Sequence, residues 1–280
     1  MQHTLSDYEA ALTPARANFS NRMAALYDRA TPSVAALFLM HYSSQGVGMT
    51  RDVPTWITGA GTAAEAAGYR DLGRMLREHA VHEAGHHEMM ERDVVSLVAW
   101  WNERFEKQLS AAAICGEAEL AAVAAYRQLH LDLIEQAPYA QIAVEFEVER
   151  LSVGEGPKLF RKVIGKLDLQ VVRCLSFLTE HVAIDAGHTR LNERALGRLL
   201  KQHPETFAGL VQHGAAALDA YAGFIEGCFA LADASVRNQA LQVAKRRRRS
   251  WRIVVREKFD AMKFLLQAFV QGRLAGSGPT

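Results

Sequence analysis

A short polar pattern near residue 181 most constrains how this chain can fold. His181, Asp185 and His188 are spaced H-x3-D-x2-H, and apolar or small residues fill the positions between them. Because each residue of an α-helix advances the chain by about 100°, the three side chains share one helical face. Their apolar neighbours indicate that this face points inward. Burying three titratable groups is costly without a partner, so the pattern predicts a metal-binding helix inside a helical core.

The same pattern occurs about 100 residues earlier in the chain. His79, Glu83 and His86 are spaced H-x3-E-x2-H, and both segments have Ala-Gly before the last histidine. The alternative explanation is that these are ordinary amphipathic helices whose polar side chains pair with one another. That explanation would suffice for one such triplet, but it is weaker for two. The repeat therefore favours a metal centre to which both helices contribute ligands.

A third predicted helix, 138–152, lies between these segments and offers further carboxylates. Glu145 and Glu149 are four residues apart and share one face of that helix. Their spacing does not choose between them. We expect His79, one turn before Glu83, to orient that carboxylate in preference to binding metal, although it can also act as a ligand. The expected metal ligands are Glu83, His86, Glu149 (or Glu145), His181, Asp185 and His188.

This mixture of imidazoles and carboxylates indicates which metal to expect. Six ligands exceed the roughly three that a catalytic zinc takes, and the set has too much nitrogen for calcium or magnesium. Two histidines and one carboxylate with open positions are typical of iron that activates O2. Di-iron carboxylate bundles use the Glu-x-x-His spacing. The sequence thus predicts two Fe(II) ions that react with O2.

Composition excludes several other classes. The net charge is +1 and the three cysteines are far apart, so neither a nucleic-acid partner nor a disulfide framework is indicated. No run of about 18 apolar residues predicts a membrane span, and the N-terminus lacks the apolar stretch of a signal peptide. We expect a cytoplasmic protein. Scarce proline, abundant alanine and leucine, and the lack of alternating patterns predict an all-α fold.

We predict one helical domain over residues 1–280, with a core at about 30–230 and a C-terminal helix at about 234–273. That helix contains the basic run 245–252, which we interpret as a solvated face or a contact between subunits of a homodimer.

Several helix boundaries also follow from the sequence. We expect the first helix to begin at the N-cap Ser6 and to be interrupted by Pro14. Thr31-Pro32 should begin the next helix, and the stretch 43–54 should connect it to the following one. A nearly continuous helix is predicted over 69–105, bent near Arg92-Asp93. The helix that carries His181 should begin at Asp168.

Three segments resemble one known superfamily. The stretch LREHAVHEAGHHEMM at 76–90, the segment 179–188 and the stretch that begins at Glu149 resemble the ligand helices of haem-oxygenase-like di-metal oxidases and oxygenases. Over about 30–230, the resemblance implies a bundle of about seven helices with two irons. It selects Glu149 over Glu145, because Glu149 lies 32 residues before His181, about where that family has its glutamate.

The resemblance also implies a type of reaction. Such proteins oxidise amines and amino acids by N-oxygenation, C–C cleavage or desaturation, mostly in natural-product biosynthesis. Some members space the first-helix ligands E-x6-H, whereas this chain has E-x2-H. A small amine or amino-acid substrate would need a pocket, for which Tyr126, His130 and Arg150 are candidates, and Arg127 and Lys158 are further cations within reach.

Three alternatives remain at this stage. Ferritin-like di-iron N-oxygenases have a similar late motif, but with Glu at the position of Asp185. Cofactor-free enzymes of the thiaminase and quinone-cofactor-synthase type share the haem-oxygenase-like fold without needing these ligands. A helical interaction protein could instead bind partners through the basic face at 245–252.

Overall fold

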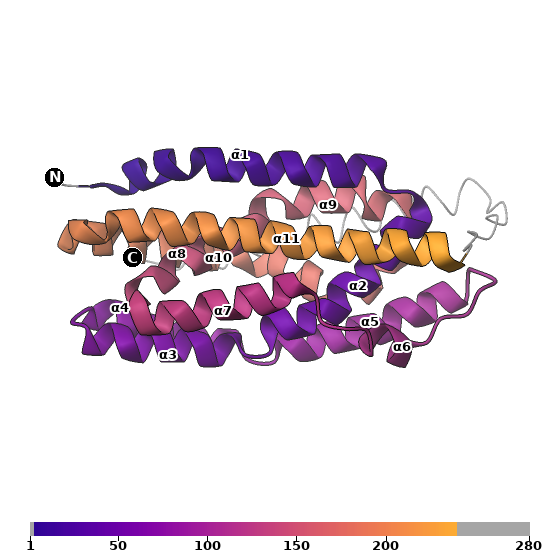
Figure 1. The fold of residues 1–280 in the computed structure, drawn as a ribbon, viewed down its shortest axis with the longest axis horizontal. Coiled ribbons are helices and arrows are strands. Elements are labelled where there is room, and N and C mark those ends of the chain that lie inside the picture. Colours follow the sequence, from indigo (N-terminus) through magenta and orange to yellow (C-terminus); the bar gives the residue numbers. More distant parts are fainter. Residues whose placement is uncertain (1–2, 240–280) are drawn as a thin grey trace, which may run out of the picture.

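The structure, a computed structural model, describes residues 3–239, and every regular element in that range is a helix. The predicted all-α class is therefore confirmed. Figure 1 shows the long helices running roughly along a common axis. The elements are α1 (Leu5–Arg29), α2 (Pro32–Thr50), α3 (Val53–Ala66), α4 (Arg70–His82), α5 (His86–Asn102), α6 (Ala111–Cys115), α7 (Ala121–Gln136), η1 (Pro138–Ala140), α8 (Gln141–Gly154), α9 (Gly156–Lys162), η2 (Ile164–Lys166), η3 (Leu169–Cys174), α10 (Ser176–Gln202), η4 (Pro204–Thr206) and α11 (Phe207–Gln239).

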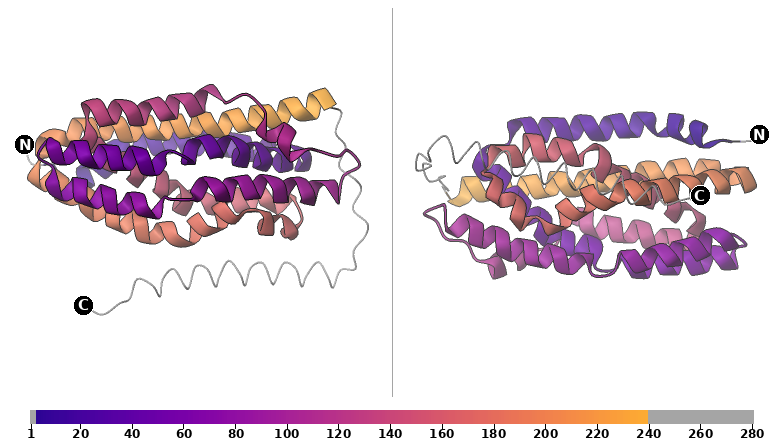
Figure 2. Two further views of the ribbon diagram at one scale, coloured as in Figure 1. Left: turned by 90° about the horizontal axis from the view of Figure 1, so that it is seen from below. Right: turned by 180° about the vertical axis from the view of Figure 1, so that it is seen from behind.

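The longest helix, α11, contributes buried residues such as Leu218 and Phe224 to the core. It packs against α1, α2, α7 and α8, and Phe229 on α11 stacks on Phe38 of α2 with ring centroids 3.9 Å apart. Helix α8 contacts α11 and also packs against α10, and α10 in turn contacts α5 and the end of α4 (Figure 2). The helices α4, α5, α8 and α10, which carry the predicted ligands, therefore lie next to one another.

Helix α11 differs from expectation at its C-terminal end. It continues without a break past the predicted boundary at about 230–234, and the basic run 245–252 lies outside the described residues. The segment Pro204–Arg237 is also long and apolar enough to cross a membrane by length and composition, although 44% of its most apolar window is buried inside the bundle. A core helix has the same properties, and α11 packs against four other helices.

The N-terminal helix begins earlier than predicted and contains its proline. Thr4, not Ser6, is the N-cap, and it forms a capping box with Asp7. Pro14 lies inside α1 on its exposed face, where water can bind the carbonyl oxygen that loses its partner. The predicted start of α2 is confirmed, because the Thr31 side chain accepts a hydrogen bond from the backbone N–H of Val34.

The predicted connection at 43–54 is helical as far as Thr50. A Cβ atom on Gly46 would lie 2.6 Å from Sδ of Met90, so this glycine allows α2 and α5 to pack closely and does not form a turn. Only Arg51 and Asp52 separate α2 from α3.

The predicted continuous helix 69–105 is also wrong, because the chain breaks between α4 and α5. Gly85 has a φ of 86°, a left-handed conformation that favours glycine. Asp93 does not mark a bend either. It lies within α5, where its carboxylate accepts hydrogen bonds from the backbone N–H groups of Ser176 (2.8 Å) and Phe177 (3.0 Å). This distant cap fixes the start of α10, eight residues after Asp168.

Candidate metal centre

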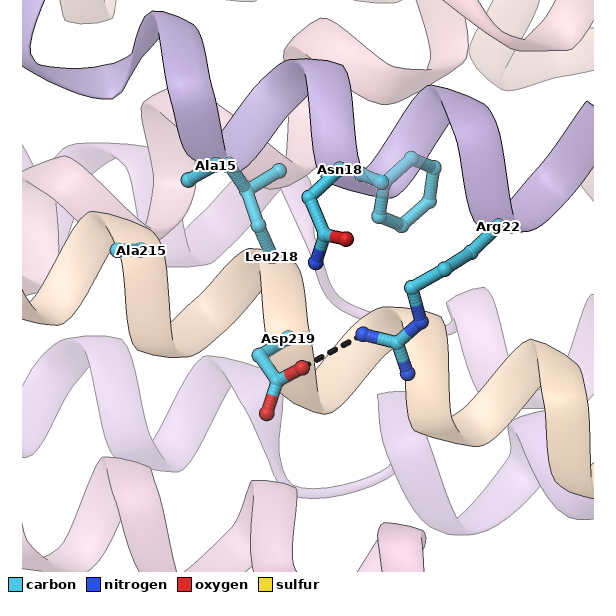
Figure 3. Close-up of a pocket in the computed structure, with 7 residues that line it drawn as sticks. Ala15, Asn18, Arg22, Ala215, Leu218 and Asp219 are labelled. Carbon is cyan, nitrogen blue, oxygen red and sulfur yellow. Dashed lines mark hydrogen bonds and ion pairs between the residues drawn. The ribbon is translucent and has the colours of Figure 1, made fainter.

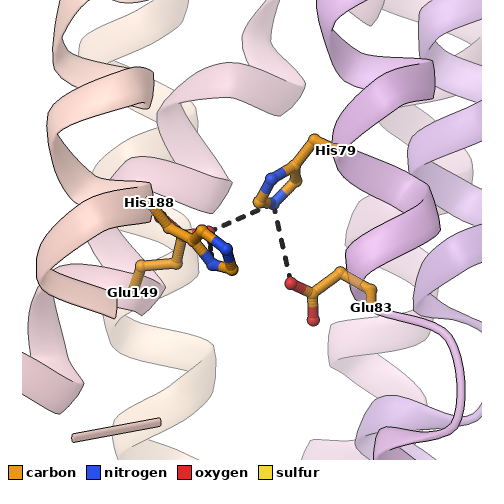
Figure 4. A group of neighbouring side chains, drawn as sticks. All are labelled: His79, Glu83, Glu149 and His188. Carbon is orange, nitrogen blue, oxygen red and sulfur yellow. Dashed lines mark ion pairs between the residues drawn. The ribbon is translucent and has the colours of Figure 1, made fainter. Parts of the chain in front are cut away.

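Four side chains from three segments converge between α4, α8 and α10. Ligand atoms of His79, Glu83, Glu149 and His188 all lie within 4.8 Å of one another. His79 Nε2 lies 3.1 Å from Glu149 Oε1 and 3.7 Å from Glu83 Oε1 (Figure 4). The two histidines and two carboxylates therefore surround a common point, which we name the first group.

A second group lies on the other side of Glu83. Ligand atoms of Glu83, His86 and His181 also lie within 4.8 Å of one another. His86 Nδ1 is 2.8 Å from Glu83 Oε2, and the rings of His86 and His181 are 4.5 Å apart. Glu83 thus turns Oε1 toward His79 of the first group and Oε2 toward His86 of the second. One carboxylate between two sets of ligands is the arrangement of a bridged two-metal centre.

The two similar sequence patterns adopt different backbone conformations. His181, Asp185 and His188 lie on one uninterrupted helix, α10. Glu83 is instead the C-cap residue of α4, and His86 is the first residue of α5. The turn through Gly85 joins them, so that Glu83 reaches both groups.

His181 has a defined orientation. Its Nδ1–H donates a hydrogen bond to the backbone carbonyl oxygen of Phe177 at 2.8 Å, which leaves Nε2 free to bind a metal. Burial, together with the neighbouring His86, lowers the pKa of His181 to about 4, so the imidazole is neutral near pH 7.

His79 contacts the centre directly, although we favoured a supporting role for it. Burial lowers its pKa, but the carboxylates of Glu145 and Glu149 outweigh that effect and raise it to about 11. A metal ion that binds His79 must therefore displace a proton. His82, one turn of α4 from His79, is exposed, and its ring stacks on that of His188 with the ring centroids 5.5 Å apart.

Both α8 carboxylates that the sequence could not separate face the centre. Glu149 belongs to the first group, and Glu145 Oε2 lies 3.6 Å from His79 Nε2. Burial raises the pKa of Glu149 to about 7, although the neighbouring His79 acts in the opposite direction. Glu145 is therefore a further candidate ligand and not a substitute for Glu149.

Asp185 lies beside the first group without belonging to either group. Its Oδ1 is 3.8 Å from His188 Nδ1, and the residue is only 2% exposed. Burial raises the pKa of Asp185 to about 8, although a hydrogen bond from Ser152 lowers it.

The chemistry of these residues fits two metal ions. Buried polar atoms usually have hydrogen-bond partners, yet His79 Nε2, Glu149 Oε1 and Asp185 Oδ2 have none. Within residues 3–239, the carboxylates at the centre form ion pairs only with histidines and with no lysine or arginine. The centre contains four carboxylates, those of Glu83, Glu145, Glu149 and Asp185. When ionised, their negative charges would balance the positive charges of two divalent ions.

Two of the three predicted pocket residues lie close to the centre. Tyr126 is buried, and Glu145 and Glu83 lie close enough to raise its pKa, after the larger effect of burial. His130 is fully buried and forms a hydrogen bond with Gln141, which in turn donates to Glu145. Gln141 is a functional candidate that sequence analysis missed, as is Asn192, which donates to Glu149.

Arg150 does not lie at the centre. Its guanidinium donates to Glu9 at 2.7 Å and its side chain is 41% exposed. The other cations that we considered are also paired elsewhere, Arg127 with Glu119 and Lys158 with Glu155. All three of these cations therefore pair with carboxylates that belong to neither ligand group.

A small hollow elsewhere on the bundle lacks such chemistry. It lies between α1 and α11, where Arg22 forms an ion pair with Asp219 beside Asn18 and Leu218 (Figure 3). It shares no residue with either ligand group.

Comparison with known proteins identifies the architecture. No family model and no curated protein match this sequence. A crystal structure from Shewanella denitrificans OS217, described as a domain of unknown function with a haem oxygenase-like fold, is similar with a TM-score of 0.58. The match covers 82% of this chain and 90% of that chain, at 16% sequence identity. This chain has a haem-oxygenase-like fold. The expected fold is confirmed, and such low identity carries over no activity.

Proposed function

We propose that this haem-oxygenase-like protein is a non-haem di-iron oxidase or oxygenase that uses O2 to oxidise a small amine or amino acid, with a role in natural-product biosynthesis. The observation that carries the proposal is Glu83, whose two oxygens face two different groups of histidines. The fold disfavours the ferritin-like alternative.

The two groups would hold the two irons. His79, Glu149 and His188 would hold the first, His86 and His181 the second, and Glu83 would contact both. Iron bound there would supply the electrons that reduce O2 and would activate it for attack on a substrate. The second group offers fewer protein ligands, so an ion held there would be the more accessible of the two to O2 or substrate.

The surrounding residues of this chain would prepare the centre for that chemistry. The buried carboxylates balance the metal charge, and the Phe177 carbonyl oxygen fixes the orientation of His181. Tyr126 would form one wall of the substrate pocket. Because Arg150, Arg127 and Lys158 are paired elsewhere, an amine without a carboxylate is favoured over an amino acid.

Reconstitution with Fe(II) in the absence of O2 tests this proposal. We expect two irons per chain by elemental analysis and O2 consumption with some member of an amine panel. His188→Ala should lose iron and activity, whereas Glu78→Gln, at an exposed position of the same α4 helix that carries His79, should keep both. Protein that retains no iron, or that oxidises its substrate equally well in a chelator, would show the proposal to be wrong. The second result would favour a cofactor-free enzyme.

A further inference from the structure

Two buried side-chain amides each donate a hydrogen bond to one of the two α8 carboxylates. The Gln141 side-chain amide donates to Glu145 Oε1, and the Asn192 amide donates to Glu149 Oε2 at 2.6 Å. Gln141 is fully buried and Asn192 is 1% exposed, so water does not compete for these hydrogen bonds.

Each amide leaves the other carboxylate oxygen directed at the centre. Glu145 Oε2 lies 3.6 Å from His79 Nε2, and Glu149 Oε1 lies 3.1 Å from the same atom. Glu149 Oε1 has no hydrogen-bond partner of its own. The two carboxylates are thus held in the same way, although their amides come from different helices.

A neutral amide suits this task better than a cation. Lysine or arginine would orient a carboxylate but would also repel a metal ion, whereas an amide donates a hydrogen bond without adding charge. Gln141 is itself held in place, because His130 Nδ1 lies 3.0 Å from its Nε2 and the His130 ring stacks on Trp56 at 4.7 Å.

We propose that Gln141 and Asn192 are positioning residues for one metal ion only, the one bound by the first group, and that Glu145 is a ligand of that ion beside Glu149. This inference rests on the proposed function in requiring metal binding at the centre. The second group contains neither α8 carboxylate, so its metal affinity should not depend on either amide.

Co(II) titration of the full-length protein, followed by absorption in the absence of O2, tests the inference. Wild type should bind two ions in two resolved phases. Gln141→Leu and Asn192→Leu, which remove the donor but keep a similar volume, should weaken one phase about 10–100-fold and leave the other unchanged. Asn192→Ala serves as a second variant in case the leucine does not fit.

Gln45 provides a matched control. It is also a buried amide, and it joins α2 to the segment before α7 by donating to the Ala118 carbonyl oxygen and accepting from the Leu120 N–H. Gln45→Leu should lower thermal stability without changing either Co(II) phase.

The outcomes separate the two proposals. If both phases weaken equally in the amide variants, or neither phase changes, the positioning role is refuted while two-ion binding by wild type still supports the metal centre. If wild type binds no Co(II), both the positioning role and the proposed function are refuted.

Discussion

Gly85 and Gly187 occupy equivalent places in the two Ala-Gly-His segments, and replacing each by alanine should have opposite effects. Gly85 has a φ of 86° in the turn between α4 and α5, whereas Gly187 lies within α10 and has no positive φ. A Cβ atom at either position would meet no atom within 4 Å. The backbone conformation alone therefore decides the sign of each effect.

The magnitudes follow from that conformation. A left-handed backbone conformation costs an L-residue about 1–2 kcal/mol. Alanine also lowers the conformational entropy of the unfolded chain relative to glycine, which offsets about 0.4–1 kcal/mol of that cost. Gly85→Ala should therefore lower the free energy of unfolding by about 1 kcal/mol. Gly187→Ala should stabilise by about 0.5–1 kcal/mol, because glycine is the poorer residue inside a helix. At about 2–4 °C per kcal/mol for a chain of this size, the two melting temperatures should differ by about 3–8 °C.

Calorimetry of the two metal-free variants beside wild type measures this difference. Iron content supplies a second measurement, because Gly85→Ala should also displace Glu83 and His86 and so reduce iron in both groups, while Gly187→Ala should not. Shifts of the same sign, or a stabilised Gly85→Ala variant, would refute the assignment of a left-handed turn between the two ligands.

Three further perturbations have definite expected results. Asp93→Asn should cost about 2 kcal/mol, since hydrogen bonds to charged groups contribute about 1.5–3 kcal/mol and the Ser176 end of α10 loses its charged cap; urea denaturation measures this, and an unchanged midpoint would contradict the capping role. Arg16→Met should lower the free energy of unfolding by about 3–5 kcal/mol, because it leaves the fully buried Glu147 without the arginine that donates two hydrogen bonds to it. The double variant Arg16→Met/Glu147→Gln should recover part of this loss, and strictly additive effects in the double-mutant cycle would show that the pair is not coupled. Metal at about 100 times its dissociation constant should raise the free energy of unfolding by about 2.7 kcal/mol for each occupied site, which is about 5–11 °C per site, and a chelator should reverse the shift; a melting temperature insensitive to both would contradict a metal centre in the native state.

The sequence predicted the side chains of the centre better than the backbone that carries them. Helical periodicity is a local property, so the spacing of His181, Asp185 and His188 was enough to place them on one face of α10. The same reasoning made 69–105 one helix. It could not distinguish Gly85 from Gly187, because both follow alanine and precede histidine, and only the surrounding packing decides which one leaves the helix.

Contacts between distant segments account for the other differences. Gly46 looks like a loop residue until Met90 of α5 is placed against it, and Asp93 looks like a bend until Ser176 of α10 is placed beside it. The amides Gln141 and Asn192 gave no signal because each belongs to an ordinary helical sequence and becomes recognisable only when its carboxylate partner is known. The single-domain extent of 1–280, the homodimer, the lack of a nucleic-acid partner and the cytoplasmic location stay predictions.

Identical spacing gives His79 and His181 different surroundings, and the packing of α8 beside His79 explains the difference. On α10 the helix continues, so His181 keeps Phe177 one turn behind it as a hydrogen-bond acceptor and faces only the second group. On α4, Glu83 lies one turn after His79 as the C-cap residue, and the two α8 carboxylates face the same histidine. His79 consequently meets Glu83, Glu145 and Glu149 together. The asymmetry of the centre thus originates in the packing of α8 beside His79, because the i,i+4 contact between His79 and Glu83 is one that an uninterrupted helix would also give.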